Sequence, residues 1–328
     1  MSSPRFGVML VNLGTPESPT PAAVRRYLAE FLWDRRVIDV SRPLWWLILN
    51  GIVLRTRPKR VAHAYASVWQ DEGSPLLAIG RRQQRALKAR LDERFGTDVP
   101  VELAMTYGKP TMEEAGMAFR RAGVERILVF PLYPQYSRST TASVFDRLAK
   151  ALKDCPHLPE MRFIRDYHDH PGYIAALASS VEEHWEREGK RGHLLMSYHG
   201  IPKRYAEEGD PYPKHCERTS RLVAEKLGLA DDEWTMSYQS RFGREEWLKP
   251  YTDETLMAWG KQGRERVDVM SPAFSADCLE TLEEIAVENR DNFINAGGKE
   301  YSFIESLNDR DDHIALFESL IVHHTEGW

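Results

Sequence analysis

One histidine and three evenly spaced glutamates are the residues whose types and spacing best suit metal chemistry. His199 follows the apolar run LLMSY, and Glu280, Glu284 and Glu288 recur every four residues in a predicted helix. Side chains four residues apart share one face of a helix, so these glutamates would form a ladder of carboxylates. Imidazole and carboxylate groups bind divalent metals, and an imidazole also exchanges protons near neutral pH. The set therefore indicates a site for a divalent metal.

Each of these signals also has a structural interpretation. A run of acidic residues is usually a solvated face, and the helix macrodipole would stabilise Glu280 near the helix N-terminus in any case. On the residues alone, the solvated face is the better interpretation of the ladder. A histidine at the end of a strand is often a hydrogen-bonded packing residue. Gly200 and Pro202 favour function slightly, because they predict a tight turn that leaves the imidazole exposed.

A wider set of polar and aromatic residues lies just past the ends of predicted strands, where open α/β sheets bind their ligands. Aromatic and apolar side chains suit a large flat ligand, whereas a histidine with carboxylates suits a metal. The tyrosines of YPQYS fit an exposed rim equally well. The set comprises Asn12, Leu13, Tyr107, Lys109, Tyr133, Gln135, Tyr136, His199, Gln239, Arg241, Phe274, Asp277 and Glu280.

The elements that must position these residues alternate between short apolar strands and helices. The run FGVMLVNLG predicts a buried strand, and residues 21–32 predict a helix with Thr20 as N-cap and Pro21 at its first position. The same unit recurs along the chain to a last helix at about residues 312–323. Short apolar strands that alternate with helices predict parallel sheets covered on both faces. The expected fold class is α/β, with two similar doubly wound domains and the ligand site in the cleft between them.

The length of 328 residues is long for one hydrophobic core and sufficient for two. Asp154, Pro156 and Pro159 interrupt the alternation, so we expect the domain boundary there. The expected domains are residues 1–155 and 156–307. The last helix, at about 308–328, is expected to pack back on the first domain.

Composition excludes several classes of function. A net charge of -5 and an isoelectric point near 6.2 give no basic surface for nucleic acid. Cys155, Cys216 and Cys278 lie far apart without a CxxC pair, which argues against a disulfide framework or a zinc knuckle and favours a reducing compartment. The phosphate-binding, dinucleotide-binding, serine-hydrolase and zincin motifs are missing from the sequence. The expected location is the cytoplasm.

The longest apolar run, residues 44–54, is interrupted by Asn50 and Gly51. It is shorter than the roughly 20 residues that a membrane-spanning helix needs, so no transmembrane segment is expected. The N-terminal residues predict a strand rather than a signal peptide. Trp45 and Trp46 are expected in the core of a helix rather than at the lip of a ligand site. Peripheral contact of this region with a membrane stays open.

The sequence resembles the ferrochelatases over essentially its whole length. An HGxP turn followed by GDPY is highly specific to that family. The resemblance is carried by VNLGTPESPTPAAVRRYLAEFLWDRRVID, by PLYPQYSRSTTASVFD, and by SYHGIPKRYAEEGDPYPKHCERT with YQSRFGREEWLKPYTDETL and SPAFSADCLETLEEIAVENR. It implies two doubly wound domains and an enzyme that inserts Fe²⁺ into protoporphyrin IX, forming protohaem and releasing two protons.

The resemblance also implies roles for individual residues. His199 and Glu280 match the family's catalytic pair, and Glu284 and Glu288 match its acidic metal path, which overturns the solvated-face interpretation. The set of metal residues is then His199, Glu280, Glu284 and Glu288. Some members carry Tyr where this chain has Leu13, so any contact through that hydroxyl is lost. The implied porphyrin contacts are Leu13, Arg57, Tyr65, Ser74, Tyr107, Tyr136, Trp247 and Phe274.

The expected substrates are protoporphyrin IX and Fe²⁺, and the expected oligomeric state is a monomer. Other family members carry a C-terminal extension with cluster cysteines, whereas no Cys follows Cys278 in this sequence. No iron–sulfur cluster and no permanently bound cofactor are therefore expected. Two alternatives stay open: a chelatase for another tetrapyrrole or metal, such as coproporphyrin or cobalt, and a non-catalytic carrier of haem or metal.

Overall fold

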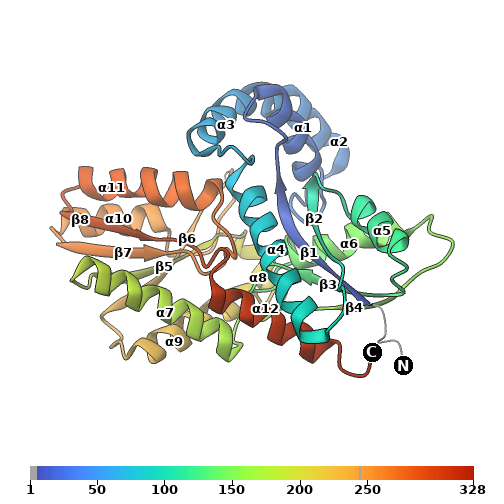
Figure 1. The fold of residues 1–328 in the computed structure, drawn as a ribbon. Coiled ribbons are helices and arrows are strands. Elements are labelled where there is room, and N and C mark those ends of the chain that lie inside the picture. Colours follow the sequence, from blue (N-terminus) through green and yellow to red (C-terminus); the bar gives the residue numbers. More distant parts are fainter. Residues whose placement is uncertain (1–5, 244) are drawn as a thin grey trace. The chain divides into compact units, whose positions relative to one another are not determined.

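The computed structural model describes residues 6–243 and 245–328. Their internal contacts divide the chain into two compact units, each built of helices around a parallel sheet (Figure 1). The first unit comprises the chain up to Tyr133 together with Arg138–Asp166 and Asp309–Trp328, and the second comprises Pro134–Ser137 and Tyr167–Asn308. The two sheets confirm the predicted α/β class with two doubly wound domains.

The sheet of the first unit is parallel throughout, in the strand order β2-β1-β3-β4. Its central strand β1 is buried along nearly its whole length, as expected of a strand covered on both faces. The strands are β1 (Phe6–Thr15), β2 (Val101–Gly108), β3 (Arg126–Pro131) and β4 (Glu160–Phe163). The helices are α1 (Pro21–Leu32), α2 (Arg42–Ile48), the π-helix η1 (Leu49–Val53), α3 (Leu54–Val68), α4 (Pro75–Phe95), α5 (Met112–Arg121), α6 (Thr141–Leu152) and α12 (Asp311–His324).

Local sequence signals explain where the helices of this unit begin. Thr20 caps α1 by accepting a hydrogen bond from the amide of Ala23, and Pro21 occupies the first turn, so the predicted bounds of 21–32 are confirmed. Helix α5 begins with a capping box, in which Thr111 and Glu114 each accept from the other's main-chain N–H.

The second unit repeats the topology of the first, with the strand order β6-β5-β7-β8 and all pairs parallel. In both sheets the first strand in sequence lies between the second and the third. The strands are β5 (His193–His199), β6 (Trp234–Gln239), β7 (Arg266–Met270) and β8 (Glu300–Ile304). The helices are α7 (Pro171–Glu188), α8 (Lys203–Glu207), α9 (Tyr212–Leu227), α10 (Thr252–Lys261), the π-helix η2 (Glu280–Asn289) and α11 (Arg290–Asn295).

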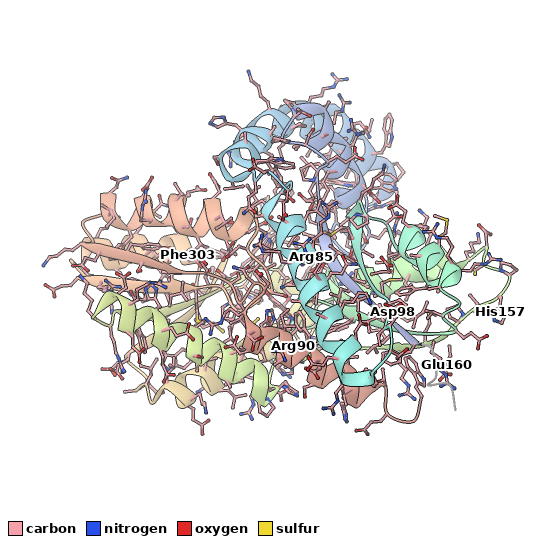
Figure 2. The ribbon with its side chains drawn as sticks, viewed as in Figure 1. Arg85, Arg90, Asp98, His157, Glu160 and Phe303 are labelled. Carbon is pink, nitrogen blue, oxygen red and sulfur yellow. The ribbon has the colours of Figure 1, made fainter. Side chains whose placement is uncertain are left out.

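The expected boundary at residue 155 falls before a strand that belongs to the first sheet. Strand β4 pairs with β3, with Glu160 opposite Arg126, so the chain passes into the second unit only after Asp166. Asp154, Pro156 and Pro159 mark a loop within the first unit. At the end of the chain, α12 lies in the first unit beside α4, where Arg90 pairs with Glu318 at 3.3 Å; Figure 2 labels Arg90 and Glu160.

The apolar run at residues 44–54 is only partly a helix core. Trp45 is buried and donates its indole N–H to the main-chain oxygen of Leu32 at 2.7 Å. In contrast, Trp46 and Leu47 are 55% and 61% exposed, so the expected burial of this run is wrong for its outer face. Across residues 6–243 and 245–328, none of the helices combines the length and apolarity that crossing a bilayer requires.

Candidate active site

The carboxyl edge of the second sheet brings several of the predicted residues together. His199 is the last residue of β5 and lies opposite Gln239, the last residue of β6. Strand β7 pairs with β5 on its other side, and the chain that follows β7 leads into the π-helix η2. In parallel sheets this edge is where ligands bind.

The hydrogen bond of His199 determines its tautomer. Its Nδ1 lies 2.7 Å from the main-chain oxygen of Gly200. Because a carbonyl oxygen only accepts hydrogen bonds, Nδ1 carries the proton in the neutral ring and Nε2 carries the lone pair. Nε2 is therefore the atom that can accept a proton or bind a metal.

The residues around His199 are closely packed. A Cβ at Gly200 would lie 2.9 Å from the main-chain oxygen of Gln239 and 3.1 Å from the Trp247 ring, so a side chain there has no space. The imidazole lies near two aromatic rings, with its centroid 6.4 Å from that of Trp247 and 6.5 Å from that of Phe274. These three predicted residues thus form one cluster.

The acidic ladder begins with the first residue of η2. A π-helix is rare, and when it occurs it is frequently at a functional site. Side-chain donors bind several of its carbonyl oxygens: Gln239 binds that of Glu280 at 3.0 Å, and Tyr301 binds that of Ile285 at 2.7 Å. Because Gln239 also lies opposite His199, it connects the histidine strand to the start of the ladder.

Two hydrogen bonds hold the Glu284 carboxylate in place. Its two oxygens accept hydrogen bonds from Ser240, one from the main-chain N–H at 2.8 Å and one from the hydroxyl. The pKa of Glu284 is raised to about 7, mainly by burial and to a lesser extent by the neighbouring Glu280 and Glu288 carboxylates, while the Ser240 hydrogen bonds lower it. A group with this pKa exchanges protons near neutral pH. Glu288, by contrast, is exposed.

The predicted porphyrin contacts divide between the two units. Trp247 and Phe274 lie near His199, and Tyr136 donates its main-chain N–H to Nδ1 of His215 at 3.3 Å, all in the second unit. The first unit holds Leu13 in β1, Arg57 and Tyr65 in α3, Ser74 before α4 and Tyr107 in β2.

Three of those first-unit residues are buried and already make contacts within their own unit. Tyr65 packs edge-on against Trp69, and Ser74 caps α4 by accepting from the amide of Leu77. The Tyr107 hydroxyl donates to Asp34 at 2.7 Å, and burial raises its pKa, so it stays protonated at neutral pH. Their part in porphyrin binding remains a prediction.

Other candidates have structural partners. Arg241 pairs with Asp253 and Glu254 on the surface, and Lys109 pairs with Glu17. Asp277 is buried and accepts hydrogen bonds from several groups, including the Thr281 hydroxyl at 2.8 Å. Asp277 therefore stabilises the start of η2.

Two further residues, Ser240 and Cys278, lie next to the predicted ones. Ser240 directly follows Gln239, and its contact with Glu284 joins residues 44 positions apart in the chain, which spacing does not reveal. Cys278 is buried two residues before Glu280, and burial raises the pKa of its thiol well above the usual value. The thiolate is the form that binds metals, so burial disfavours Cys278 as a metal ligand.

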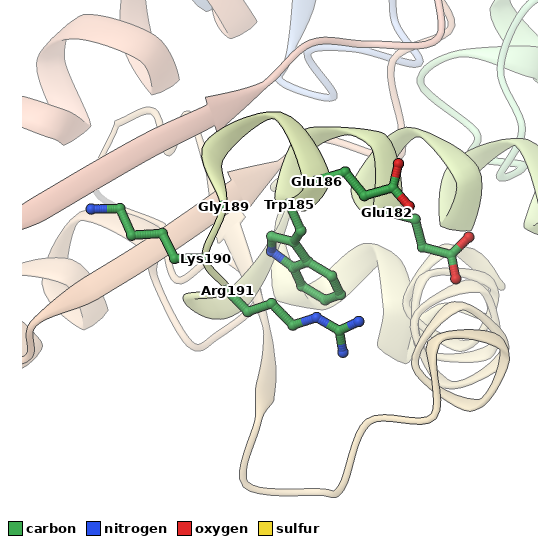
Figure 3. A pocket seen from close by; sticks show the side chains of 6 residues that line it. All are labelled: Glu182, Trp185, Glu186, Gly189, Lys190 and Arg191. Carbon is green, nitrogen blue, oxygen red and sulfur yellow. The ribbon is translucent and has the colours of Figure 1, made fainter.

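A cavity of about 370 Å³ lies elsewhere in the second unit (Figure 3). Its lining includes the end of α7, where Arg191 lies 4.8 Å from the centroid of the Trp185 ring, and Figure 3 shows Lys190 pointing away from that ring. These residues directly precede the amino end of β5, whereas His199 lies at its carboxyl end. This cavity is therefore separate from the candidate active site.

Known proteins match this chain along nearly its full length. The sequence model of the family described as Ferrochelatase matches residues 5–325. The chain belongs to the ferrochelatase family. Among the family's curated members, the ferrochelatase of Aeromonas hydrophila subsp. hydrophila is 56% identical over 317 residues, covering 97% of this chain and 98% of the relative. That of Photobacterium profundum is 52% identical over 328 residues and covers all of both chains, and that of Thioalkalivibrio sulfidiphilus is 54% identical over 98% of this chain and 88% of the relative.

Two solved structures share the fold of this chain. SirB from Bacillus subtilis with Fe³⁺ superposes with a TM-score of 0.56 at 11% identity, covering 98% of this chain and 96% of that chain. CbiX, described as the terminal enzyme for biosynthesis of siroheme in denitrifying bacteria, gives a TM-score of 0.51 at 15% identity, covering 97% and 98%. At these identities the likeness shows the fold alone.

Proposed function

We propose that this protein inserts Fe²⁺ into protoporphyrin IX and so forms protohaem, with release of two protons. The observation that carries the proposal is the arrangement at the carboxyl edge of the second sheet. There, in a member of the ferrochelatase family, His199 has a free acceptor nitrogen, and the same edge is joined through Gln239 to a π-helix that begins with Glu280.

The reaction requires both proton transfer and metal transfer. Two pyrrole N–H protons leave as Fe²⁺ enters, and a flat ring directs its nitrogen lone pairs poorly towards an incoming ion. We propose that contacts remote from the reacting nitrogens hold the ring bent towards its transition-state shape, so that binding energy is used for strain. Nε2 of His199 then accepts a pyrrole proton.

The glutamates of η2 serve the metal and the remaining proton. Glu280 holds Fe²⁺ or the second proton beside His199. Glu284, with its pKa raised to about 7, passes protons in either direction near neutral pH, and the exposed Glu288 connects the ladder to solvent. The predicted porphyrin contacts complete the proposal: Leu13, Arg57, Tyr65, Ser74, Tyr107, Tyr136, Trp247 and Phe274.

The test is anaerobic mixing of the purified protein with Fe²⁺ and protoporphyrin IX. We expect the Soret band to shift to that of protohaem with many turnovers per protein molecule. A single stoichiometric binding event without turnover would instead support a carrier of haem or metal. Parallel rates with coproporphyrin and with Co²⁺ separate a protoporphyrin ferrochelatase from a chelatase for another tetrapyrrole or metal.

We also propose a cytoplasmic monomer that touches membrane surfaces transiently. The exposed side chains of Leu44, Trp46, Leu47 and Ile52 form an apolar face on α2 and η1. Positions 40–70 contain no acidic residue, but they contain the basic residues Arg42, Arg55, Arg57, Lys59 and Arg60. An apolar face with a basic border is typical of peripheral contact with anionic lipid. Cosedimentation with vesicles of anionic lipid, compared with zwitterionic vesicles, tests this, and equal absence of binding to both refutes it.

A further inference from the structure

Ser240 has an unusual backbone conformation. Its φ of 65° lies in the left-handed region, which a residue other than glycine adopts uncommonly. Within the described residues, Asn308, with a φ of 48°, is the other non-glycine residue of this kind. Such conformations persist where the surrounding structure holds them in place, and they occur preferentially at functional sites.

Both of these residues bind an acidic side chain at η2. Asn308 donates its amide to Asp277 at 2.8 Å, just before the π-helix begins. Ser240 donates its main-chain N–H and its hydroxyl to the two oxygens of Glu284, in the middle of the ladder. The left-handed turn at Ser240 is what directs the N–H and the hydroxyl of one residue at a single carboxylate.

The residue before Ser240 contacts the same helix. Gln239 donates its side-chain amide to the main-chain oxygen of Glu280 at 3.0 Å, and its own Oε1 accepts from the Ser197 hydroxyl at 2.8 Å. Gln239, the last residue of β6, and Ser240, which follows it, thus bind η2 at Glu280 and Glu284. These two residues therefore hold the first two glutamates of the ladder, Glu280 through its main-chain oxygen and Glu284 through its carboxylate.

We propose that Ser240 is a positioning residue for the Glu284 carboxylate in metal delivery. The inference rests on the proposed function. A glutamate side chain has several rotatable bonds, so its carboxylate can take many orientations. To bind a metal ion as the ion passes, the carboxylate must be held in one of them. Groups that hydrogen-bond a metal-binding side chain orient it, and removing them typically costs 10- to 100-fold in metal affinity or activity.

The experiment compares Ser240→Ala and Ser240→Gly with the wild-type protein, using anaerobic Fe²⁺ and, in a separate series, Zn²⁺. Both variants lose the hydroxyl and keep the main-chain N–H, but only glycine adopts the left-handed conformation freely. We expect kcat/KM for the metal to fall about 10- to 100-fold in both variants, with porphyrin KM unchanged. Ser179→Ala is the matched control, because the Ser179 hydroxyl also binds a glutamate, Glu183 at 3.1 Å, on the exposed face of α7. It is expected to match the wild type.

Three results would overturn the inference. The first is wild-type metal kinetics in both Ser240 variants. The second is a loss in Ser240→Ala that Ser240→Gly does not share, since this would attribute the effect to backbone strain. The third is an equal loss in kcat/KM for metal and for porphyrin together with a lowered melting temperature, which marks a structural role. If the wild-type protein had no chelatase activity, the proposed function itself would be wrong. Failure of the Ser240 inference can therefore be distinguished from failure of the proposed function.

Discussion

His199 donates its Nδ1 proton to the main-chain oxygen of Gly200, its own neighbour in the chain. This contact leaves Nε2 unprotonated in the neutral ring, and it depends on a glycine that no larger residue can replace. The proton acceptor of the proposed reaction is thus set by the local backbone.

Replacing His199 with alanine removes that acceptor. We expect turnover of Fe²⁺ and protoporphyrin to fall by about 10²- to 10⁴-fold, the range typical of general acid–base groups. Porphyrin affinity, measured by fluorescence quenching, is expected to change little. His157→Ala is the control, since His157 is an exposed histidine of the first unit, labelled in Figure 2. Undiminished turnover in His199→Ala would refute the assignment.

Replacing Glu280 with glutamine keeps the shape of the side chain and removes its charge. We expect a loss in kcat that far exceeds any change in porphyrin KM, because the carboxylate acts on the metal and on protons during the reaction. Steady-state kinetics with each substrate varied in turn checks this. Glu186→Gln, an exposed change on α7, controls for the loss of one charge. The opposite pattern, a raised porphyrin KM with normal kcat, would make Glu280 a binding residue.

Glu284→Gln is expected to stabilise the protein while it impairs the enzyme. The pKa of Glu284 is raised from 4.5 to about 7 on folding, so between these pH values the folded state binds more protons than the unfolded state. The free energy of unfolding of the wild type therefore falls as pH rises through this window, and glutamine, which cannot ionise, avoids that fall. The predicted gain is absent below about pH 4.5 and reaches at most about 3 kcal/mol above pH 7.

Thermal and urea unfolding between pH 4 and pH 8, with a chelator present, measures this difference. Glu186→Gln is the control, because Glu186 is exposed on α7 and lies outside the ladder. A stability difference between Glu284→Gln and the wild type that is the same at every pH would show that ionisation of Glu284 does not cause it.

Asn308→Ala is expected to destabilise the fold more than Asn308→Gly. Asn308 accepts from the Asp277 amide and donates to its carboxylate, both at 2.8 Å, so either change loses these bonds at a cost of about 2 kcal/mol. Alanine adds the cost of a left-handed φ, which glycine does not have. Chemical denaturation of both variants gives the comparison. Equal free energies of unfolding would show that backbone conformation contributes little there.

Metal choice is expected to be broad in vitro. Imidazole and carboxylate ligands bind Fe²⁺, Co²⁺ and Zn²⁺ with affinities that follow the general order of divalent metals and do not select iron. We expect insertion of Zn²⁺ and Co²⁺ into protoporphyrin at rates comparable to that of Fe²⁺, measured by absorbance. Strict rejection of Zn²⁺ would show that the protein supplies selectivity beyond these ligands.

Much of the fold follows from local sequence signals. The cap at Thr20 with Pro21 gives the bounds of α1, and alternating strands and helices give both sheets. The position of the domain boundary does not follow from such signals. The helix- and strand-breaking residues between Asp154 and Pro159 would be the same whether the next strand began a second sheet or extended the first. The strand β4 extends the first sheet through long-range pairing with β3.

The candidate site follows from the sequence only in part. His199 and the ladder stand out by type and spacing, but spacing of four residues fits an α-helix as well as the π-helix that forms. The role of Ser240 depends on a backbone dihedral angle and a distant partner, and neither leaves a mark in the sequence. Likewise, the pattern around Trp45 predicts one buried helix face without saying that Trp46 and Leu47 stay exposed.

The exposed side chains of Trp46 and Leu47 have a consequence for how activity is measured. Protoporphyrin dissolves poorly in water and is supplied with detergent, and micelles adsorb to apolar protein faces. Measured rates should therefore depend on whether the detergent is above its critical micelle concentration, and a Trp46→Ser, Leu47→Ser double variant should lose that dependence. Kinetic constants for this enzyme will be comparable between laboratories only when the detergent is held constant.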